Sequence, residues 1–434
     1  MSDSRRDFLK KSGLLGAGVL ASAGIVSAQH QGHMHPQPSP EPPKPEQPPE
    51  KKEAPAKKAT PGVARPSQIS ANVPVETPDV PKLPFTLDNG VKVFHLSAEV
   101  VKTTLLPGMR EMFGWGYNGS VPGPTIEVNE GDRVRIILQN KLPEPTSIHW
   151  HGIEVPTAMD GVPFINQPPI EPGASFTYEF TLHQHGTFFY HSHGAMQQMM
   201  GTIGLFIIHP QTPPTPHCDK DFGIILQEWA LLPNNPVPNT LKMEFNWLTI
   251  NGKAGPATTP MIVRQGERVR LRMVNLGMDH HPMHMHGHQF YVTGTEGGRV
   301  PETAWYPGNT VLVGVAQARD VEFEAVHAGN WMFHCHLPHH MMNNMVSMVG
   351  QNMGGADEAQ KKQVPGYPQE MIMIMDKEVA KPQTYGLPPG WTASMMGMMT
   401  LVRVLPDEEY DEVQRRIREG IVEAPQAMPV HKHD

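Results

Sequence analysis

Cysteine is scarce in this chain of 434 residues, and so is charge. The two cysteines, Cys218 and Cys335, can form at most one disulfide; we expect none, and expect Cys218 to be a free thiol. Only 18% of the residues are charged and the formal net charge is -8, so the composition gives no sign of the basic patch that nucleic-acid binding requires. Beyond the N-terminal segment, no apolar run approaches transmembrane length, and we expect no membrane span in the mature chain.

Histidine, methionine and proline are abundant instead, with 24, 28 and 46 copies. The stretch "FHCHLPHHMMNNM", residues 333–345, holds four His, one Cys and three Met. Imidazole together with thioether favours copper over zinc, because thioether ligands favour Cu(I). A single Met is more often a filler of core gaps, so the combination indicates a metal where the count alone does not.

The N-terminal segment, residues 1–28, resembles a twin-arginine signal peptide. Arg5 and Arg6 precede a short, weakly apolar run that ends at a small-residue site before Gln29. This pattern predicts export of the folded protein, and therefore a periplasmic or secreted location.

The rest of the chain divides into four parts by composition. Residues 29–84 are Pro-rich with several His and Met, which predicts a disordered linker. Short β-rich runs with period-two alternation follow, separated by Gly and Pro, and they predict an all-β fold of two β-sandwich domains, 85–212 and 213–380. Residues 381–434 are expected to form a Met-rich C-terminal extension with a short helix near 406–420.

An internal repeat supports the two-domain division. Residues 117–140 match residues 250–275, and alignment at the shared "RVR" places the copies 135 positions apart. Farther along, "GTFFYHSH" (186–193) matches "GNWMFHCH" (329–336) at a shift of 143. Two homologous domains therefore carry matched histidines at matched strand ends.

The matched histidines form four His-X-His pairs. Residues i and i+2 of a strand project to the same face, so each pair is a two-pronged imidazole clamp. Eight imidazoles exceed the needs of one ion but suit three, and a cluster of three redox-active coppers suits O₂. The pairs are His149/His151, His191/His193, His284/His286 and His334/His336.

A second centre is predicted from the remainder of the His-rich stretch. Cys335, His340 and Met345, with His281 from "HPMHMH", supply the two His, one Cys and weak axial Met of a blue copper site. Cys335 lies between His334 and His336, so the two centres share one strand. The repeat places different residues at the four corresponding positions of the first domain, namely Thr146, Ser192, Gln197 and Thr202.

With these motifs, residues of about 85–350 resemble a multicopper oxidase, specifically the two-domain, laccase-like kind with type 1 copper in its C-terminal domain. The resemblance implies two cupredoxin-like Greek-key β-sandwiches and four coppers per functional unit: one type 1, one type 2 and two type 3. It assigns type 2 copper to His149 and His284, and type 1 to His281, Cys335, His340 and Met345. It assigns the type 3 pair to His151, His191, His193, His286, His334 and His336.

The resemblance also implies a proton donor and an assembly. Asp160, nine residues after His151, matches the acidic residue that delivers protons near the type 2 copper. Only 88 positions separate His193 from His281, which leaves no room for a middle domain. We therefore expect a homotrimer in which the first domain of one subunit meets the second domain of the next.

Several functions stay open at this point. The main expectation is one-electron oxidation of phenols or aromatic amines coupled to the four-electron reduction of O₂ to water. Cuprous-ion oxidation in copper tolerance is the alternative, because of the Met clusters at 196–200, 371–375 and 395–399. A copper nitrite reductase and a non-enzymatic copper or electron-transfer protein are less favoured, because neither uses all eight paired histidines.

Overall fold

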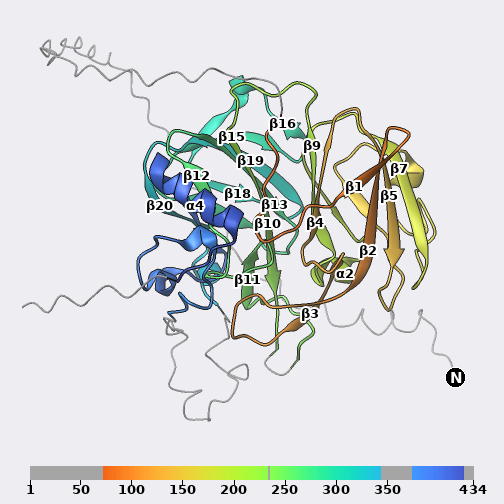
Figure 1. Ribbon diagram of the computed structural model, residues 1–434. Coiled ribbons are helices and arrows are strands. Elements are labelled where there is room, and N and C mark those ends of the chain that lie inside the picture. The colour runs from red at the N-terminus through yellow and green to blue at the C-terminus, as the bar shows by residue number, and fades with distance from the viewer. Residues whose placement is uncertain (1–71, 233–234, 344–373, 425–434) are drawn as a thin grey trace, which may run out of the picture. The chain divides into compact units, whose positions relative to one another are not determined.

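The computed structural model describes residues 72–232, 235–343 and 374–424, which form two β-sandwiches (Figure 1). The first sandwich pairs a sheet of order β1-β2-β5-β7, with β3 on β2, against a sheet of order β4-β9-β8-β6. Its strands are β1 Phe85–Asp88, β2 Val91–Thr103, β3 Met112–Tyr117, β4 Gly123–Asn129, β5 Arg133–Asn140, β6 His149–His151, β7 Ser175–Thr181, β8 Gly186–His191 and β9 Ile203–His209. Two short helices accompany them, η2 Thr157–Met159 and α2 Ala195–Met199.

The second sandwich repeats this plan with additional strands. One sheet has the order β11-β10-β13-β19-β15-β16, with β17 on β15, and the other has the order β12-β21-β20-β14-β18. The strands are β10 Lys220–Trp229, β11 Trp247–Ile250, β12 Met261–Arg264, β13 Arg268–Asn275, β14 His281–Met285, β15 Phe290–Thr295, β16 Gly298–Arg299, β17 Tyr306–Gly308, β18 Thr310–Val313, β19 Gln317–Glu324, β20 Gly329–Cys335 and β21 Met399–Leu405. The helices are η3 Glu302–Ala304, η4 Pro338–Met341, η6 Pro382–Thr384, η7 Trp391–Ser394 and α4 Asp407–Glu419.

Alternation along the strands builds each core. In β5 the side chains of Val134, Ile136 and Leu138 are fully buried while their neighbours face outward. Trp150, between the two histidines of β6, is also fully buried and packs edge-on against Tyr178. The inward apolar residue between two outward histidines thus fixes the register of the His-X-His strand.

The two sandwiches contact each other through an apolar layer and a buried polar link. Phe189 and Leu205 of the first sandwich share a buried cluster with Ile225 and Val274 of the second. Next to it, the Thr187 hydroxyl donates to Asp320 at 2.7 Å and accepts from the Arg272 guanidinium at 2.8 Å.

The expected linker 29–84 ends earlier than predicted. From residue 72 the chain lies on the sandwiches: Val75 and Leu83 are buried, and the Leu83 N–H donates to Thr125 O at 2.8 Å. Apolar residues spaced among prolines anchor this strap, which composition alone had assigned to disorder.

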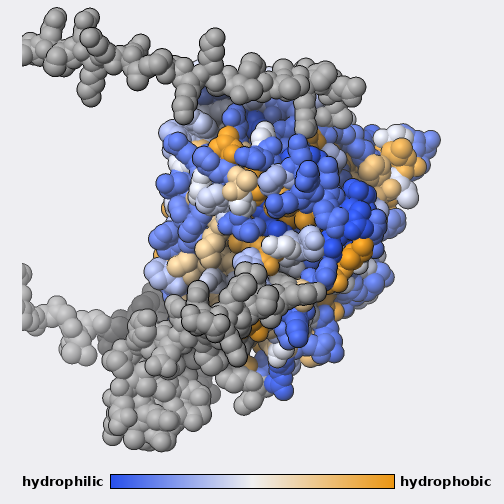
Figure 2. All heavy atoms as spheres, turned by 60° about the vertical axis from the view of Figure 1, so that its left-hand side comes forward, coloured by the Kyte–Doolittle hydropathy of each residue, from blue (hydrophilic) through white to orange (hydrophobic). Residues whose placement is uncertain are grey.

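The expected C-terminal extension 381–434 is also corrected. Its strand β21 lies inside the second sandwich, antiparallel to β20 and parallel to β12, so the second domain extends past residue 380. The helix predicted near 406–420 is α4, which packs Tyr410 and Val413 on Ile262 and Leu405. Figure 2, which turns this side of the molecule forward, shows mainly hydrophilic residues with small apolar groups between them. Within the described ranges, no helix has the length and apolar character that crossing a membrane would need.

Candidate metal centres

Strands β6 and β8 bring together the four histidines predicted in the first sandwich. His149 lies opposite His191 in the antiparallel register, and its ring contacts His151, His191 and His193 at centroid distances of 5.6, 5.4 and 5.7 Å. Nδ1 of His151 is 3.4 Å from Nε2 of His191. Burial lowers the pKa of His191 to about 4 and also lowers the pKa of His151, which keeps both imidazoles in the neutral, metal-binding form.

Strands β14 and β20 repeat this arrangement in the second sandwich. His284 lies opposite His334, and its ring contacts His286, His334 and His336 at 4.9, 5.6 and 5.4 Å. Nε2 of His286 and Nε2 of His334 are 3.0 Å apart. Burial lowers the pKa of both of these imidazoles. His149 and His284 thus hold the same central place in their sets, as the repeat predicts.

Backbone carbonyls orient four of these rings. Nδ1 of His149 lies 2.8 Å from Asp160 O, and Nδ1 of His284 lies 2.7 Å from Asn309 O. The rings of His191 and His334 each direct Nδ1 at the carbonyl of the next residue, at 2.9 and 2.8 Å. A ring that donates from Nδ1 leaves Nε2 free for a metal, so these contacts fit imidazole ligation.

The two sets of histidines make no direct contact with each other in the part of the chain that the structure describes. Among residues 72–232, 235–343 and 374–424, no hydrogen bond or ring contact joins a histidine of the first set to one of the second. One set lies on the sheet that contains β6, the other on the sheet that contains β14. Each set alone offers four imidazoles.

Asp160 lies beside the histidines of the first set. Besides its carbonyl contact with His149, its carboxylate Oδ1 is 3.4 Å from Nδ1 of the same ring, and the side chain is 34% exposed. The loop can approach this closely because Gly161, at φ +87°, follows: a Cβ there would lie 1.7 Å from Ile148 O. A carboxylate between solvent and the ring is suited to carry protons.

The thiol site is assembled in the core of the second sandwich. Cys335 Sγ lies 3.8 Å from Nδ1 of His281 and 3.5 Å from Nδ1 of His340, and the two nitrogens are 3.2 Å apart. Metal bonds of roughly 2.0–2.3 Å in a trigonal plane separate donor atoms by about 3.5–4 Å, so the three atoms fit one ion. Met345, the predicted axial ligand, lies outside the described residues.

Burial sets the protonation of this site before a metal binds. Cys335, His281 and His340 are at most 1% exposed. Burial raises the pKa of the Cys335 thiol to about 12 and lowers the pKa of His340 to about 3. The metal-free site therefore holds a thiol at Cys335 and a neutral imidazole at His340, and a bound metal would displace the thiol proton. Cys218, the other cysteine, is a buried free thiol 3.5 Å from the Arg270 guanidinium.

Comparisons with known proteins agree with this geometry. Residues 99–213 and 231–353 each match a family described as multicopper oxidase. Laccase-2 of Botryotinia fuckeliana is 34% identical over 281 residues, which cover 58% of this chain and 47% of laccase-2. Copper resistance protein A of Pseudomonas syringae pv. tomato is 38% identical over 138 residues, 32% of this chain and 23% of that protein. The chain thus spans about half, or less, of the length of these two relatives.

A solved structure decides the family. The blue copper oxidase of Nitrosomonas europaea is 34% identical, with a TM-score of 0.54, over 58% of this chain and 81% of that one. The chain belongs to the multicopper oxidases.

In this multicopper oxidase, the first sandwich holds a polar replica of the thiol site. Ser192 stands where the second sandwich has Cys335, and its hydroxyl donates to Gln197 Oε1 at 2.6 Å. The Thr146 hydroxyl lies 3.2 Å from Ser192 Oγ and 2.7 Å from Gln197 Oε1. The residues that the repeat places at these positions thus form a compact polar cluster, whose oxygen atoms lie closer together than the donor atoms of the thiol site.

Two acidic neighbours of the thiol site were not predicted from the sequence. Glu228 of β10 and Asp279, in the loop before β14, face the outer nitrogens of His281 and His340. Asp279 is two residues before the predicted ligand His281, and this proximity in the sequence could have indicated that it lies near the site. Glu228 gave none, because it reaches the site only through the pairing of β10 with β13.

Histidines outside the predicted sets have other partners. Nδ1 of His185 lies 3.3 Å from Glu130, and Nδ1 of His280 accepts the Val315 N–H at 3.0 Å. The contact of His280 makes Nδ1 an acceptor and so places the proton of the neutral ring on Nε2, which supports the interpretation that His280 is not a metal ligand.

Proposed function

We propose that this multicopper oxidase couples the one-electron oxidation of a small reducing substrate, phenolic or aromatic amine, to the four-electron reduction of O₂ to water. When bound, copper would supply the one-electron redox chemistry. In this proposal a type 1 ion is held by His281, Cys335, His340 and Met345. A three-copper cluster is held by His149, His151, His191, His193, His284, His286, His334 and His336.

One structural relationship supports the proposal above all others. Cys335 directs its sulfur into the core toward His281 and His340, while the neighbouring His334 and His336 belong to the histidine set of the opposite face. A few covalent bonds along one strand therefore join the two sites. Asp160 would supply protons next to His149, and burial of the thiol site excludes water from the entry centre.

The direct test is the electron balance of the copper-loaded full chain. We expect a substituted phenol to be oxidised with one O₂ consumed per four electrons and without hydrogen peroxide release. Accumulation of peroxide, or reduction of nitrite in place of O₂, would contradict the proposal and favour the rival classes.

Cuprous-ion oxidation is the second candidate, favoured by the similarity to copper resistance protein A. The Met residues of 395–399 give it little support, because Met395, Met398 and Met399 are at most 5% exposed and pack in the core. Met196, on α2, is 45% exposed and is a better candidate for contact with Cu(I). Comparing kcat/KM for Cu(I) and for a phenol, in the unvaried chain and in Met196→Leu, separates the candidates. A cuprous oxidase that uses Met196 would lose Cu(I) turnover and keep phenol turnover.

A homotrimer would complete the three-copper cluster. The separate histidine sets support it, because each set needs an opposite set from another copy if the two cannot meet within one chain. Next to Asp160, the loop tip carries Phe164 and Ile165, 87% and 79% exposed, an apolar pair suited to burial against a neighbour. Light scattering should give three chains per particle, and Phe164→Ser with Ile165→Ser should weaken assembly and cluster loading together.

We also propose export by the twin-arginine route to the periplasm or the medium. The signal lies outside the described residues, so its support comes from the sequence. Replacement of Arg5 and Arg6 by Lys should retain the precursor in the cytoplasm, whereas normal export of that variant would contradict the proposal.

A further inference from the structure

Glu228 lies buried directly behind one imidazole of the thiol site. Its side chain is 0% exposed, and Oε1 is 2.9 Å from Nε2 of His281, close but not aligned as a hydrogen bond. The same carboxylate accepts the backbone N–H groups of Met278 at 3.1 Å and Asp279 at 2.9 Å. The partners of Glu228 at this site are thus two backbone nitrogens of the loop that leads into β14 and the side chain of the first residue of β14.

The two ring nitrogens of His281 consequently face different groups. Nδ1 faces Cys335 and His340, and Nε2 faces Glu228. Carboxylates behind metal-binding imidazoles fix the ring and raise its basicity. A buried negative charge close to a metal also stabilises the ion of higher charge more than the ion of lower charge.

We propose that Glu228 is a positioning residue of the type 1 centre, which holds the imidazole of His281 in its ligating orientation and lowers the reduction potential of the bound copper. The inference rests on the proposed function, since it takes His281 as a type 1 ligand. It assigns Glu228 no contact with substrate or O₂.

The first sandwich, which lacks the thiol site, lacks this carboxylate. In the parallel register of β10 and β13, Asn275 pairs with Leu226, which is two positions before Glu228. Asn140 is the repeat partner of Asn275 in the first sandwich. It pairs in the same way with Ala98, which is two positions before Val100. Glu228 therefore corresponds to Val100, and the carboxylate accompanies the thiol site.

A second exchange makes room for the carboxylate. A Cβ at Gly277 would lie 1.7 Å from Glu228 Oε2, so the loop passes the carboxylate only because residue 277 has no side chain. The corresponding residue of the first sandwich is Leu142, which is 2% exposed. Both loops make the same hydrogen bond: the backbone N–H of Gly277 donates to Asn275 Oδ1, and that of Leu142 donates to Asn140 Oδ1, each at 2.9 Å. Gly277 and Glu228 thus stand where the sister sandwich has two aliphatic side chains.

The other acid of the site does not show this specificity. Asp279 Oδ2 lies 3.5 Å from Nε2 of His340. Its repeat counterpart, Glu144, accepts from Gln197 Nε2 at 3.0 Å in the sandwich that lacks the thiol. An acid at this loop position therefore belongs to the fold, whereas Glu228 belongs to the thiol site alone.

The test is the type 1 reduction potential of the copper-loaded full chain with Glu228→Gln. We expect the visible thiolate band to remain and the ratio of Cu(I) to Cu(II) affinity to rise about tenfold, which is 59 mV for a one-electron couple. Glu228→Asp, which keeps the charge, should restore most of the original potential. An unchanged potential with an intact band in Glu228→Gln would overturn the inference.

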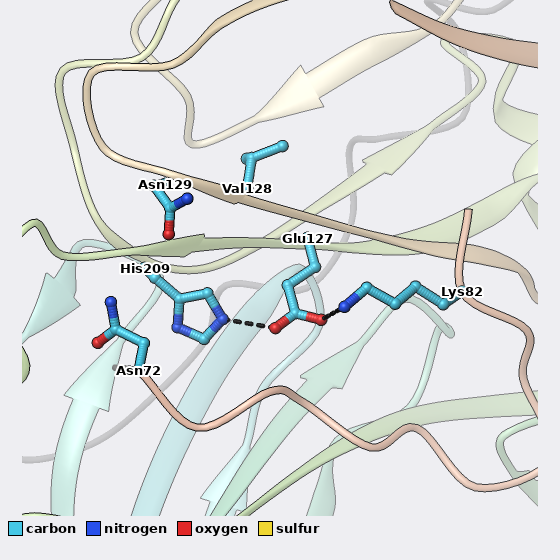
Figure 3. Close-up of a pocket in the computed structure, with 6 residues that line it drawn as sticks. All are labelled: Asn72, Lys82, Glu127, Val128, Asn129 and His209. Carbon is cyan, nitrogen blue, oxygen red and sulfur yellow. Dashed lines mark hydrogen bonds and ion pairs between the residues drawn. The ribbon is translucent and has the colours of Figure 1, made fainter. Parts of the chain in front are cut away.

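Glu127→Gln is the matched control. Glu127 of the first sandwich is also a buried carboxylate against a histidine, with Oε1 2.6 Å from Nε2 of His209 and an ion pair to Lys82 at the rim of a surface pocket (Figure 3). Its loss should lower stability and leave the type 1 potential unchanged. A potential that rises equally in Glu127→Gln would mean that the effect is general, and would also overturn the inference.

A second variant guards against loss of folding in Glu228→Gln. Gly277→Leu combined with Glu228→Val recreates the Leu142 and Val100 pair of the first sandwich and fills the space of the carboxylate with aliphatic side chains, although the N–H groups of Met278 and Asp279 lose their acceptor. We expect this double variant to fold with a raised potential, and an unchanged potential would overturn the inference. If the unvaried, copper-loaded chain itself lacks the thiolate band, the type 1 assignment fails, and with it the proposed function.

Discussion

Ser192 occupies in the first sandwich the place that Cys335 occupies in the second. The backbone carbonyl of each residue lies within 2.9 Å of Nδ1 of the preceding histidine. The side chain of each points inward, toward the two residues that occupy the positions of the predicted imidazole ligands. In one sandwich those residues are Thr146 and Gln197, and in the other they are His281 and His340. The same backbone thus presents either a compact cluster of hydrogen-bonding oxygen atoms or a set of metal-binding donors.

The replica site should bind copper once its donors are changed. Thr146→His, Ser192→Cys and Gln197→His together replace oxygen donors that lie 2.6–3.2 Å apart with the donor set of the second sandwich. We expect about one additional copper per chain and roughly twice the thiolate absorbance, measured by metal analysis and visible spectroscopy. Ser192→Cys alone, which adds a thiol without imidazoles, is the control and should add neither.

Loss of the Cys335 thiol should abolish the blue centre and spare the fold. Cys335→Ser replaces one atom in a fully buried side chain, so we expect the fold to remain and the visible band to be lost. Oxidase turnover should fall by more than ~100-fold, which exceeds the loss expected when only a residue that supports a metal ligand is removed. Cys218→Ser, at the other buried free thiol, should keep both colour and turnover. Retention of the band in Cys335→Ser would show that another residue supplies the sulfur.

Much of the fold and the grouping of the histidines could be predicted from two signals: the residue pattern within each strand, and the internal repeat. Alternation in β5 and β13 gives their inward faces, and the i, i+2 spacing places both histidines of each pair on one face of a strand. The repeat then supplied the long-range match of His149 with His284 and of His191 with His334, which no single strand could provide.

What sequence pattern missed depends on contacts between distant segments. β21 follows a Met-rich stretch and enters the sheet between β12 and β20, a pairing that its local sequence does not specify. The strap at Val75 and Leu83 has too few apolar residues to form structure alone and is fixed by the sandwiches on which it lies. Glu228 reaches His281 through a parallel strand pairing, which no repeat match pointed to.

Removal of the Asp160 carboxylate should slow O₂ reduction without changing the entry centre. Asp160→Asn keeps the backbone carbonyl that lies 2.8 Å from His149 Nδ1 and removes the group that can carry a proton. We expect turnover to fall by about 10²–10⁴, as for loss of a general acid, while anaerobic reduction of the blue band by substrate keeps its rate. Glu154→Gln, an exposed acid earlier in the same loop, should leave both rates unchanged.

Acid should destabilise the copper-free protein through its buried histidines. Burial lowers the pKa of His191 to about 4 and of His340 to about 3, whereas in the unfolded chain both titrate near 6.5. Between these limits the unfolded state binds more protons, so the free energy of unfolding falls as pH decreases from about 6.5 toward 3. Each such histidine contributes a slope of about 1.4 kcal/mol per pH unit.

Denaturant unfolding of the copper-free chain at a series of pH values measures this slope. His340→Gln, which installs the residue that the first sandwich has at this position, should remove one histidine's share of it. Copper competes with protons for the same nitrogens, so the loaded protein should keep its stability to lower pH than the copper-free one. A copper-free chain whose stability is flat from pH 6.5 to 4 would mean that these imidazoles are accessible to protons in the folded state, and that the preformed, neutral donor set does not exist.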